Sequence, residues 1–115
     1  NDKSIPVYGK GTNVREWIYV EDHCKCIWLV GEAGQTGEVY NIGSGIEVAN
    51  LDLVKKVLTT LDKPFSLIEF VKDRAGHDFR YSIDNSKFLA LTDSYKFTNL
   101  DDGLKQTIEW YKNVF

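Results

Sequence analysis

The chain has 115 residues, of which 43% are hydrophobic and 27% charged, and its formal net charge is −3. This composition is typical of a globular protein of one domain, or of part of a larger protein. The weak negative charge gives no support to nucleic-acid or membrane-surface binding, and no apolar run is long enough for a membrane-spanning helix. Cys24 and Cys26 lie two positions apart in a predicted helix and cannot bridge each other, so we expect buried free thiols and a cytoplasmic protein.

The pattern of the first third of the chain predicts extended chain or a loop, then a strand, and then a helix. Residues 1–14 are rich in turn formers and indicate extended chain or a loop, and residues 15–20 (REWIYV) alternate with the period of a strand. Helical spacing follows, with Asp22 as the expected N-cap of a helix over about residues 22–32. The apolar stripe of this helix consists of Val20, Cys24, Ile27, Trp28 and Gly31.

The middle of the chain predicts a strand, a helix and a second strand. Residues 38–43 (EVYNIG) have a strand-like pattern between glycines, and Asn50 is the expected N-cap of the helix that follows. Residues 67–71 predict a short strand, and the polar residues 73–80 (DRAGHDFR) predict a loop. The helix carries one apolar stripe, made of Leu51, Val54, Val57, Leu58 and Leu61.

The last third predicts a short strand over residues 81–83 and two helices. Asp84 or Asn85 is expected to cap a brief helix that ends near residue 91. Thr98 and Asp101 resemble a capping box that opens a last helix to about residue 113. No repeat or linker divides the chain, so we predict one small mixed α/β domain over residues 1–115. The inward positions of the last helix are expected to be Leu100, Leu104, Ile108 and Tyr111.

Gly31, Gly34 and Gly37 have the G-x-x-G-x-x-G spacing that many dinucleotide-binding enzymes use to wrap a pyrophosphate. That use requires a strand before the glycines and a helix N-terminus after them, because free N–H groups at the helix start hold the anion. Here the glycines follow a predicted helix and lead into a predicted strand. We therefore interpret Gly31 or Gly34 as the end of the helix and Gly37 as a turn residue, and we expect no NAD site here.

Three stretches concentrate side chains that suit an anion. Arg15 begins the strand of residues 15–20, and Asn41 lies in a predicted strand between glycines, where the backbone can approach a ligand closely. An arginine presents a planar fork that binds two phosphate oxygens at once, so groups converging from separate elements would clamp a diphosphate. The loop after residue 72 adds further candidates, namely Arg74, His77, Arg80 and Tyr81.

The same groups also have purely structural explanations. The two histidines show no metal-ligand or catalytic-triad pattern, and a C-x-C pair without further ligands makes a poor zinc site, so we expect no metal. The arginines can instead form surface ion pairs that order the chain, in the combinations Arg15–Glu16, Arg74–Asp73 and Arg80–Asp78.

Four stretches of the chain carry a resemblance to a known family. They are IPVYGKGTNVREWIYVEDHC (residues 5–24), GEVYNIGSG (37–45), FVKDRAGHDFRYSIDNSK (70–87) and TIEWY (107–111). In this order they resemble the C-terminal part of the dTDP-glucose 4,6-dehydratases, which are extended short-chain dehydrogenase/reductases acting on nucleotide sugars. UDP-glucuronate decarboxylases and UDP-galactose 4-epimerases share part of the pattern, and R-x-G-H-D-x-R-Y favours the dTDP-glucose dehydratases.

The resemblance implies a role for each matched residue. Two departures from the family pattern are Ala75, where a proline is usual, and LTDSY at residues 91–95, where L-G-W-x-P is usual. Neither departure touches the implied ligand groups. Pro6 and Tyr8 would lie against the base and deoxyribose of a dTDP-sugar, and the diphosphate would be held by Arg15, Asn41 and Arg74, with His77 and Tyr81 close by.

The resemblance also implies chemistry for which this chain shows no motif. Family members oxidise the sugar with NAD, eliminate water and return the hydride, using an N-terminal Rossmann domain and a Tyr-x-x-x-Lys pair. No strand–glycine loop–helix start occurs, and none of the six tyrosines is followed four residues later by lysine. We therefore expect the C-terminal substrate-binding portion of such an enzyme without its Rossmann domain, with no catalytic residues, no NAD site and no activity alone. The alternatives are a non-catalytic dTDP-sugar-binding or interaction module, or the corresponding part of another nucleotide-sugar epimerase or decarboxylase.

The resemblance predicts that this chain exposes apolar surface, because in full-length family members the same elements pack against the Rossmann domain. We expect self-association, or a swapped homodimer, to cover that surface. Light scattering over a wide range of protein concentration measures this, and a strictly monomeric chain throughout would contradict the expectation.

Overall fold

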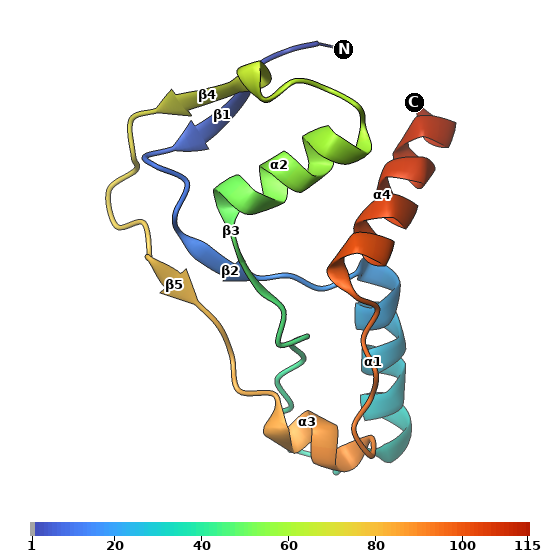
Figure 1. The fold of residues 1–115 in the computed structure, drawn as a ribbon. Coiled ribbons are helices and arrows are strands. Elements are labelled where there is room, and N and C mark those ends of the chain that lie inside the picture. The colour runs from blue at the N-terminus through green and yellow to red at the C-terminus, as the bar shows by residue number, and fades with distance from the viewer. Residues whose placement is uncertain (1) are drawn as a thin grey trace. The chain divides into compact units, whose positions relative to one another are not determined.

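Two units make up residues 2–115, the part of the chain that the computed structural model describes (Figure 1). The first unit contains the residues up to Arg15 together with Glu47–Tyr81, and the second contains Glu16–Ile46 together with Ser82–Phe115. Strands and helices both occur, as the predicted mixed α/β class requires. That the chain forms a single domain stays a prediction.

Parallel strand pairs organise the first unit. Strand β1 (Ile5–Tyr8) pairs with β4 (Ile68–Val71), and Tyr8 lies opposite Val71 in the register. Strand β2 (Val14–Glu16) pairs with β5 (Arg80–Tyr81), and β3 (Glu47–Ala49) lies on the other side of β2. Because the strands of the β1–β4 and β2–β5 pairs are parallel, the carboxyl ends of the two strands in each pair lie at the same edge.

Helix α2 (Asn50–Thr60) completes the first unit and supplies its core together with β1. Val7 and Leu58 are buried, and the stripe predicted from the sequence is buried or half-buried along its whole length. Gly11 lies between β1 and α2 with φ +69°, and a Cβ at this position would approach both Val7 and Leu51 within 3 Å. The close approach and the left-handed backbone explain why glycine is needed here. A short 3₁₀ turn, η1 (Phe65–Leu67), leads from α2 into β4.

Three helices form the second unit: α1 (Val20–Ala33), α3 (Ser86–Leu91) and α4 (Leu100–Val114). Cys26 of α1 and Phe88 of α3 are fully buried, and α1 contacts α3. The Phe88 ring meets the rings of Tyr95 and Phe97, with centroids 6.2 Å away in each case. This aromatic group holds the connection between α3 and α4 in place.

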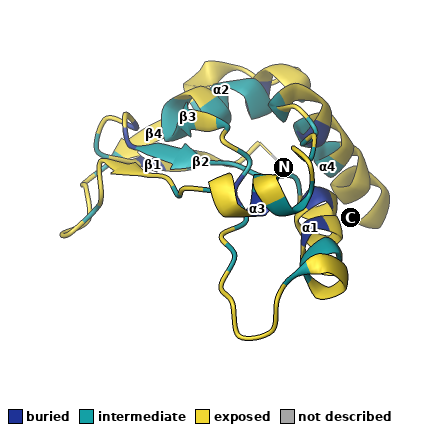
Figure 2. Cartoon of the chain, turned by 90° about the horizontal axis from the view of Figure 1, so that it is seen from below, coloured by how far each residue is buried: buried dark blue, intermediate teal, exposed yellow. Residues whose placement is uncertain are grey.

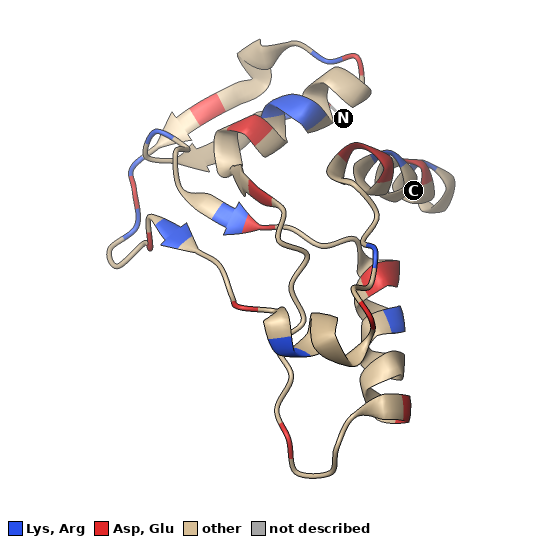
Figure 3. Cartoon of the chain, turned by 60° about the horizontal axis from the view of Figure 1, so that its bottom comes forward, with Lys and Arg blue, Asp and Glu red and all other residues tan. Residues whose placement is uncertain are grey.

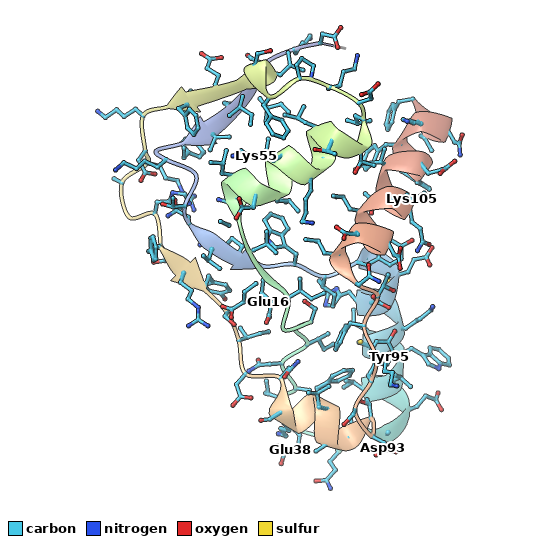
Figure 4. All side chains as sticks on the ribbon, viewed as in Figure 1. Glu16, Glu38, Lys55, Asp93, Tyr95 and Lys105 are labelled. Carbon is cyan, nitrogen blue, oxygen red and sulfur yellow. The ribbon has the colours of Figure 1, made fainter. Side chains whose placement is uncertain are left out.

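A buried carboxylate ties the same connection to α1. Asp22 is 4% exposed, and its two oxygens accept hydrogen bonds from the Tyr95 hydroxyl at 2.9 Å and from the Thr98 amide at 2.8 Å. Figure 4 labels Tyr95 on the connection between α3 and α4. Burial, and then the hydrogen bond to Asp22, raises the pKa of Tyr95 to about 12. Burial likewise raises the pKa of the Cys26 thiol to about 11.

The structure corrects three predicted helix starts. Helix α1 begins earlier than predicted, after Tyr19, because the Asp22 carboxylate is used by the α3–α4 connection and does not cap the helix. Asn50 is the first residue inside α2 and not its N-cap. Helix α4 is capped by Asn99, whose side chain accepts a hydrogen bond from the Asp102 amide, and not by Thr98.

The predicted strands agree less well with the structure. Strand β2 is shorter than residues 15–20, and residues 38–43 are not a strand, because no other strand within residues 2–115 pairs with them. Side chains hold this stretch instead: the Tyr40 hydroxyl accepts from the Gln35 amide at 3.0 Å, and the Asn85 side chain donates to the Gly43 carbonyl at 2.7 Å. The predicted strand near residue 81 is β5, and the predicted strand over residues 67–71 is β4.

The apolar stripe predicted for the first helix faces outward in α1. Val20, Ile27 and Trp28 are exposed, Trp28 by 69%, and Cys24 is exposed as well, whereas Asp22 and Cys26 are buried (Figure 2). On α4, Tyr111 is also exposed, although it was expected to face inward. The described chain therefore has apolar helix surface that nothing within its own unit covers.

We predict that removing the Tyr95 hydroxyl destabilises the second unit. Tyr95→Phe should lower the free energy of unfolding by about 1–2 kcal/mol, and Asp22→Ala by about 2–4 kcal/mol because it leaves two buried donors without a partner. Urea unfolding measures both losses. Tyr111→Phe is the matched control at an exposed tyrosine, and an equal effect of the two Tyr→Phe changes would contradict the role given to Asp22.

Candidate functional site

The candidate site lies where strands β1 and β4 end. The Gly9 amide, directly after β1, donates to the Val71 carbonyl at 2.9 Å, so the two strand ends remain together. From this edge residues 72–79, which we call the site loop, lead to β5. Ligands of parallel α/β folds commonly bind at the carboxyl edge of the strands.

Asp73 organises the site loop from within. Its Oδ1 accepts a hydrogen bond from the Arg74 amide at 2.9 Å and lies 2.8 Å from Nδ1 of His77. The hydrogen bond with His77, more than any other contact, holds the pKa of the Asp73 carboxyl below its usual value of 3.8. Gly9, with φ +59°, leaves room for this carboxylate, because a Cβ there would lie 3.0 Å from its Oδ2.

His77 is the most enclosed of the expected ligand residues. Its side chain is 4% exposed, and the Tyr8 ring meets it edge-on with a centroid distance of 6.0 Å. Tyr8 itself is 51% exposed at the end of β1. Pro6, on the same strand, is exposed and lies opposite Glu69. Burial and the bond to Asp73 fix the imidazole, while Pro6 and Tyr8 offer an accessible apolar surface.

Arg15 connects β2 to the site loop. Its Nη1 donates to the Val14 carbonyl at 2.8 Å and its Nη2 to the Asp78 carbonyl at 2.9 Å. Tyr81 is its register neighbour on β5 and is 59% exposed. Arg15 therefore bonds backbone carbonyls and not Glu16, the alternative partner considered from the sequence. A guanidinium carries five N–H donors, so these two bonds leave donors for a ligand.

The two arginines of the DRAGHDFR stretch differ in their partners. Arg80 forms a two-point ion pair with Glu47, at 2.7 Å from Nε and 2.8 Å from Nη2, and this bond raises the pKa of Arg80. The partner of Arg80 is therefore Glu47 and not Asp78, the alternative considered from the sequence. Arg74 bonds Asp73 through its backbone amide, and within residues 2–115 its exposed guanidinium forms no hydrogen bond or ion pair. Arg74 is available for an external anion.

Basic and acidic side chains are mixed at this edge. In Figure 3, basic and acidic segments alternate along the site loop, and basic segments also mark β2 and β5. Attraction of an anion therefore depends on individual arginines and not on a broad positive surface.

Asn41 belongs to the second unit, whereas the other expected ligand residues belong to the first. It is exposed, and its side-chain amide donates to the Asp84 carbonyl at 3.4 Å. It does not lie in a strand as predicted, since residues 38–46 form no strand in the described chain. Its participation with Arg15 and Arg74 stays a prediction.

The glycines at 31, 34 and 37 do not fit a dinucleotide. Gly31 lies inside α1, the Gly34 amide donates to the Val30 carbonyl at the end of that helix, and Gly37 adopts φ +83° in the turn that follows. The helix end beside them is a C-terminus, which carries partial negative charge and repels phosphate. The interpretation of Gly34 and Gly37 as helix end and turn is confirmed.

Beyond the site loop, the described residues form another pocket, but no metal site and no membrane-spanning helix. An open groove of about 560 Å³ lies in the second unit and is lined by none of the expected ligand residues; Tyr19, Glu21, Lys105 and Trp110 are among those that line it. Its acidic lining residues outnumber the single basic one, Lys105, and the groove is widely open, so we give more weight to the contacts of the site loop. Within residues 2–115 no three His, Cys, Asp or Glu side chains gather as metal ligands. None of the helices described has the length and apolarity needed to cross a bilayer.

Asn13 and Glu47 also belong to this arrangement, although no sequence pattern indicated them. Asn13 is buried and donates to the Asp78 carbonyl, and Glu47 neutralises Arg80. Asn13 lies in a stretch of turn formers, so its sequence context predicted an exposed loop. Only a prediction of the β3–β2–β5 order could have paired Glu47 with Arg80.

Comparisons with known proteins agree on one family. A family model described as GDP-mannose 4,6 dehydratase matches residues 1–107. The low-salt glycan biosynthesis protein Agl12 of Haloferax volcanii is 49% identical over 111 residues, which cover 96% of this chain and 36% of that protein. The chain spans about a third of the length of the curated relatives that it matches.

Solved structures of two enzymes are similar over nearly the whole chain. The dTDP-glucose 4,6-dehydratase DesIV of Streptomyces venezuelae, solved with NAD bound, is 40% identical with a TM-score of 0.89 over 96% of this chain and 34% of its own. A UDP-glucuronic acid 4-epimerase of Bacillus cereus, solved with UDP-glucuronic acid and NAD, is 26% identical with a TM-score of 0.87 over 99% of this chain and 37% of its own. The fold of this chain therefore recurs within longer nucleotide-sugar enzymes.

We predict that the Arg74 amide proton reports the titration of Asp73. Since the folded pKa of Asp73 is lowered, the stabilisation from its hydrogen bonds is fully present above pH 3.8 and is lost as the pH falls through the folded pKa. An NMR pH titration should give a midpoint below 3.8 for this amide shift, and Asp73→Asn should abolish the step. A midpoint at or above 3.8 would show that the carboxylate gains nothing from His77.

Proposed function

Because the chain belongs to the GDP-mannose 4,6-dehydratase family, we propose that it forms the nucleotide-sugar-binding portion of a dTDP-glucose 4,6-dehydratase. Relatives named dTDP-glucose 4,6-dehydratase are 38–44% identical and match nearly the whole chain. The ligand would be a dTDP-sugar, held chiefly through its diphosphate.

The observation that carries this proposal is the unpaired guanidinium of Arg74 beside a fixed histidine. An exposed arginine is common, but here its neighbours Asp73 and His77 are held in place while its guanidinium forms no hydrogen bond or ion pair among the described residues. Arginine binds phosphate oxygens in pairs, and a preorganised loop loses little entropy on binding. The remaining donors of Arg15 would add a second positive contact, because Arg15 already bonds the same loop.

The nucleoside would lie against Pro6 and Tyr8. Both are exposed on β1, and the Tyr8 ring is fixed on one edge by His77. An exposed aromatic ring offers a surface on which a base or a sugar can pack. Tyr81, exposed beside Arg15, would contribute a hydroxyl near the phosphates.

We propose further that these 115 residues do not catalyse the dehydration alone. The reaction expected of the family needs a hydride acceptor and an acid/base pair within hydrogen-bond reach of the sugar. NAD chemistry would supply the hydride step, but the glycines at 31, 34 and 37 do not fit that cofactor, and no tyrosine has a lysine four residues later. The role left to this chain is to bind and orient the nucleotide.

A UDP-sugar is the second candidate ligand, favoured by the similarity to a UDP-glucuronic acid 4-epimerase. The diphosphate contacts would be the same for both nucleotides. The two bases differ by the thymine methyl group, which Pro6 and Tyr8 would meet. Comparing dTDP with UDP therefore tests the nucleoside end of the proposal separately from its phosphate end.

We predict that the chain binds dTDP and that Arg74→Ala weakens this affinity about tenfold or more, the usual cost of losing a charged hydrogen bond. Isothermal titration calorimetry measures the dissociation constant. Arg80→Ala is the matched control, because it removes the same charge from an arginine already paired with Glu47, and it should change the constant less than about fivefold.

Three outcomes would contradict the proposal. Equal losses for the two arginine variants would mean that only net charge matters. Absence of dTDP binding by the parent chain would remove the binding role altogether. Turnover of dTDP-glucose by the purified chain would contradict the proposed lack of activity.

A further inference from the structure

Asn13 is a buried polar residue that the proposed ligand contacts do not use. It is 6% exposed, and its side-chain Nδ2 donates to the Asp78 carbonyl at 3.0 Å. Its own backbone carbonyl accepts from the Asn50 amide at 2.9 Å, at the start of α2. Burial of a polar side chain costs free energy unless its hydrogen bonds are made, so this contact is a fixed part of the unit.

The same carbonyl receives a second side chain. Arg15 Nη2 donates to the Asp78 oxygen at 2.9 Å, and the Val14 amide donates to the next carbonyl, that of Phe79, at 2.7 Å. Asp78 directly follows His77, so these bonds fix the end of the site loop at the peptide unit beside the imidazole. The other end is fixed by Asp73.

The two donors differ in what else they can do. Asn13 is enclosed and has no charge, whereas Arg15 is half-buried and carries further donors. With Asn13 holding the Asp78 carbonyl, Arg15 can direct Nη2 to an incoming phosphate and the loop stays in place. Without Asn13, a single guanidinium would have to hold both the loop and the ligand.

We propose that Asn13 is a positioning residue for the diphosphate site: it holds the site loop through the Asp78 carbonyl and so frees Arg15 for the ligand. This inference rests on the proposed function. It assigns to a neutral residue, which touches no ligand, part of the affinity for a nucleoside diphosphate.

The test compares Asn13→Ala and Asn13→Asp with the parent chain. The aspartate keeps the shape of asparagine but replaces the donor by an acceptor, and it carries the test if the alanine variant does not fold. Asn99→Ala is the matched control, because it removes a helix-capping asparagine from the second unit and leaves the site loop untouched. Three quantities are measured for each variant: the thermal midpoint, amide hydrogen exchange over residues 74–79, and the dissociation constant for dTDP.

We expect amide hydrogens of the site loop to exchange faster in both Asn13 variants. Both variants should also bind dTDP about five- to tenfold more weakly at a temperature where they are fully folded. Asn99→Ala should lower the midpoint and change neither of the other two quantities. In addition, Arg15→Ala should cost more affinity in the Asn13→Ala background than in the parent, since the Asp78 carbonyl then has neither side-chain donor.

A purely structural role for Asn13 would give a different result. The midpoint would fall, while loop exchange and the dissociation constant of the folded protein stayed within twofold of the parent, and this would overturn the proposal. Faster exchange with unchanged affinity would overturn it as well. If the parent does not bind dTDP, the proposed function fails, and unchanged loop exchange in the Asn13 variants would then separately exclude the positioning role.

Discussion

The Asp78 carbonyl is the point on which the candidate site depends. This carbonyl accepts hydrogen bonds from Asn13 and Arg15, and Asp78 directly follows the enclosed His77 in the chain. A surface loop without such bonds would sample many conformations, and ordering it on binding would cost free energy. Arg15 lies in β2 and Asn13 directly precedes it, so these bonds attach the site loop to the parallel β2–β5 pair.

Arg74 and Arg80, the two arginines of the DRAGHDFR stretch, differ in whether their charge is neutralised within the protein. Arg80 is paired with Glu47 and Asp73 is engaged by His77, whereas among the described residues the guanidinium of Arg74 forms no hydrogen bond or ion pair. For a chain of net charge −3, long-range attraction of a phosphate is weak, so affinity has to come from short contacts. This division of roles explains why two arginines in one motif are expected to behave differently on mutation.

The sequence predicted those parts of the molecule that local pattern controls. The stripe of α2, strand β4 and the loop around Arg74 and His77 follow from apolar spacing and turn residues, and the structure has them where expected. Partners distant in the chain were not predictable. The local pattern predicted Asp22 as a helix cap, but its carboxylate accepts hydrogen bonds from Tyr95 and Thr98, more than seventy residues away. The apolar stripe of α1 was predicted to face inward but is exposed. The reason is related: an apolar pattern indicates a face that can be buried, but not which partner surface buries it. The roles of the expected ligand residues came from the family resemblance and stay predictions.

The most direct test of the account is an NMR titration of the 115-residue chain with dTDP, read residue by residue. We predict that amide shifts change first at the end of β1 near Tyr8, at β2 near Arg15 and along the site loop from Arg74 to His77. Shifts that instead change around the groove lined by Tyr19 and Lys105, or that do not change at all, would contradict it.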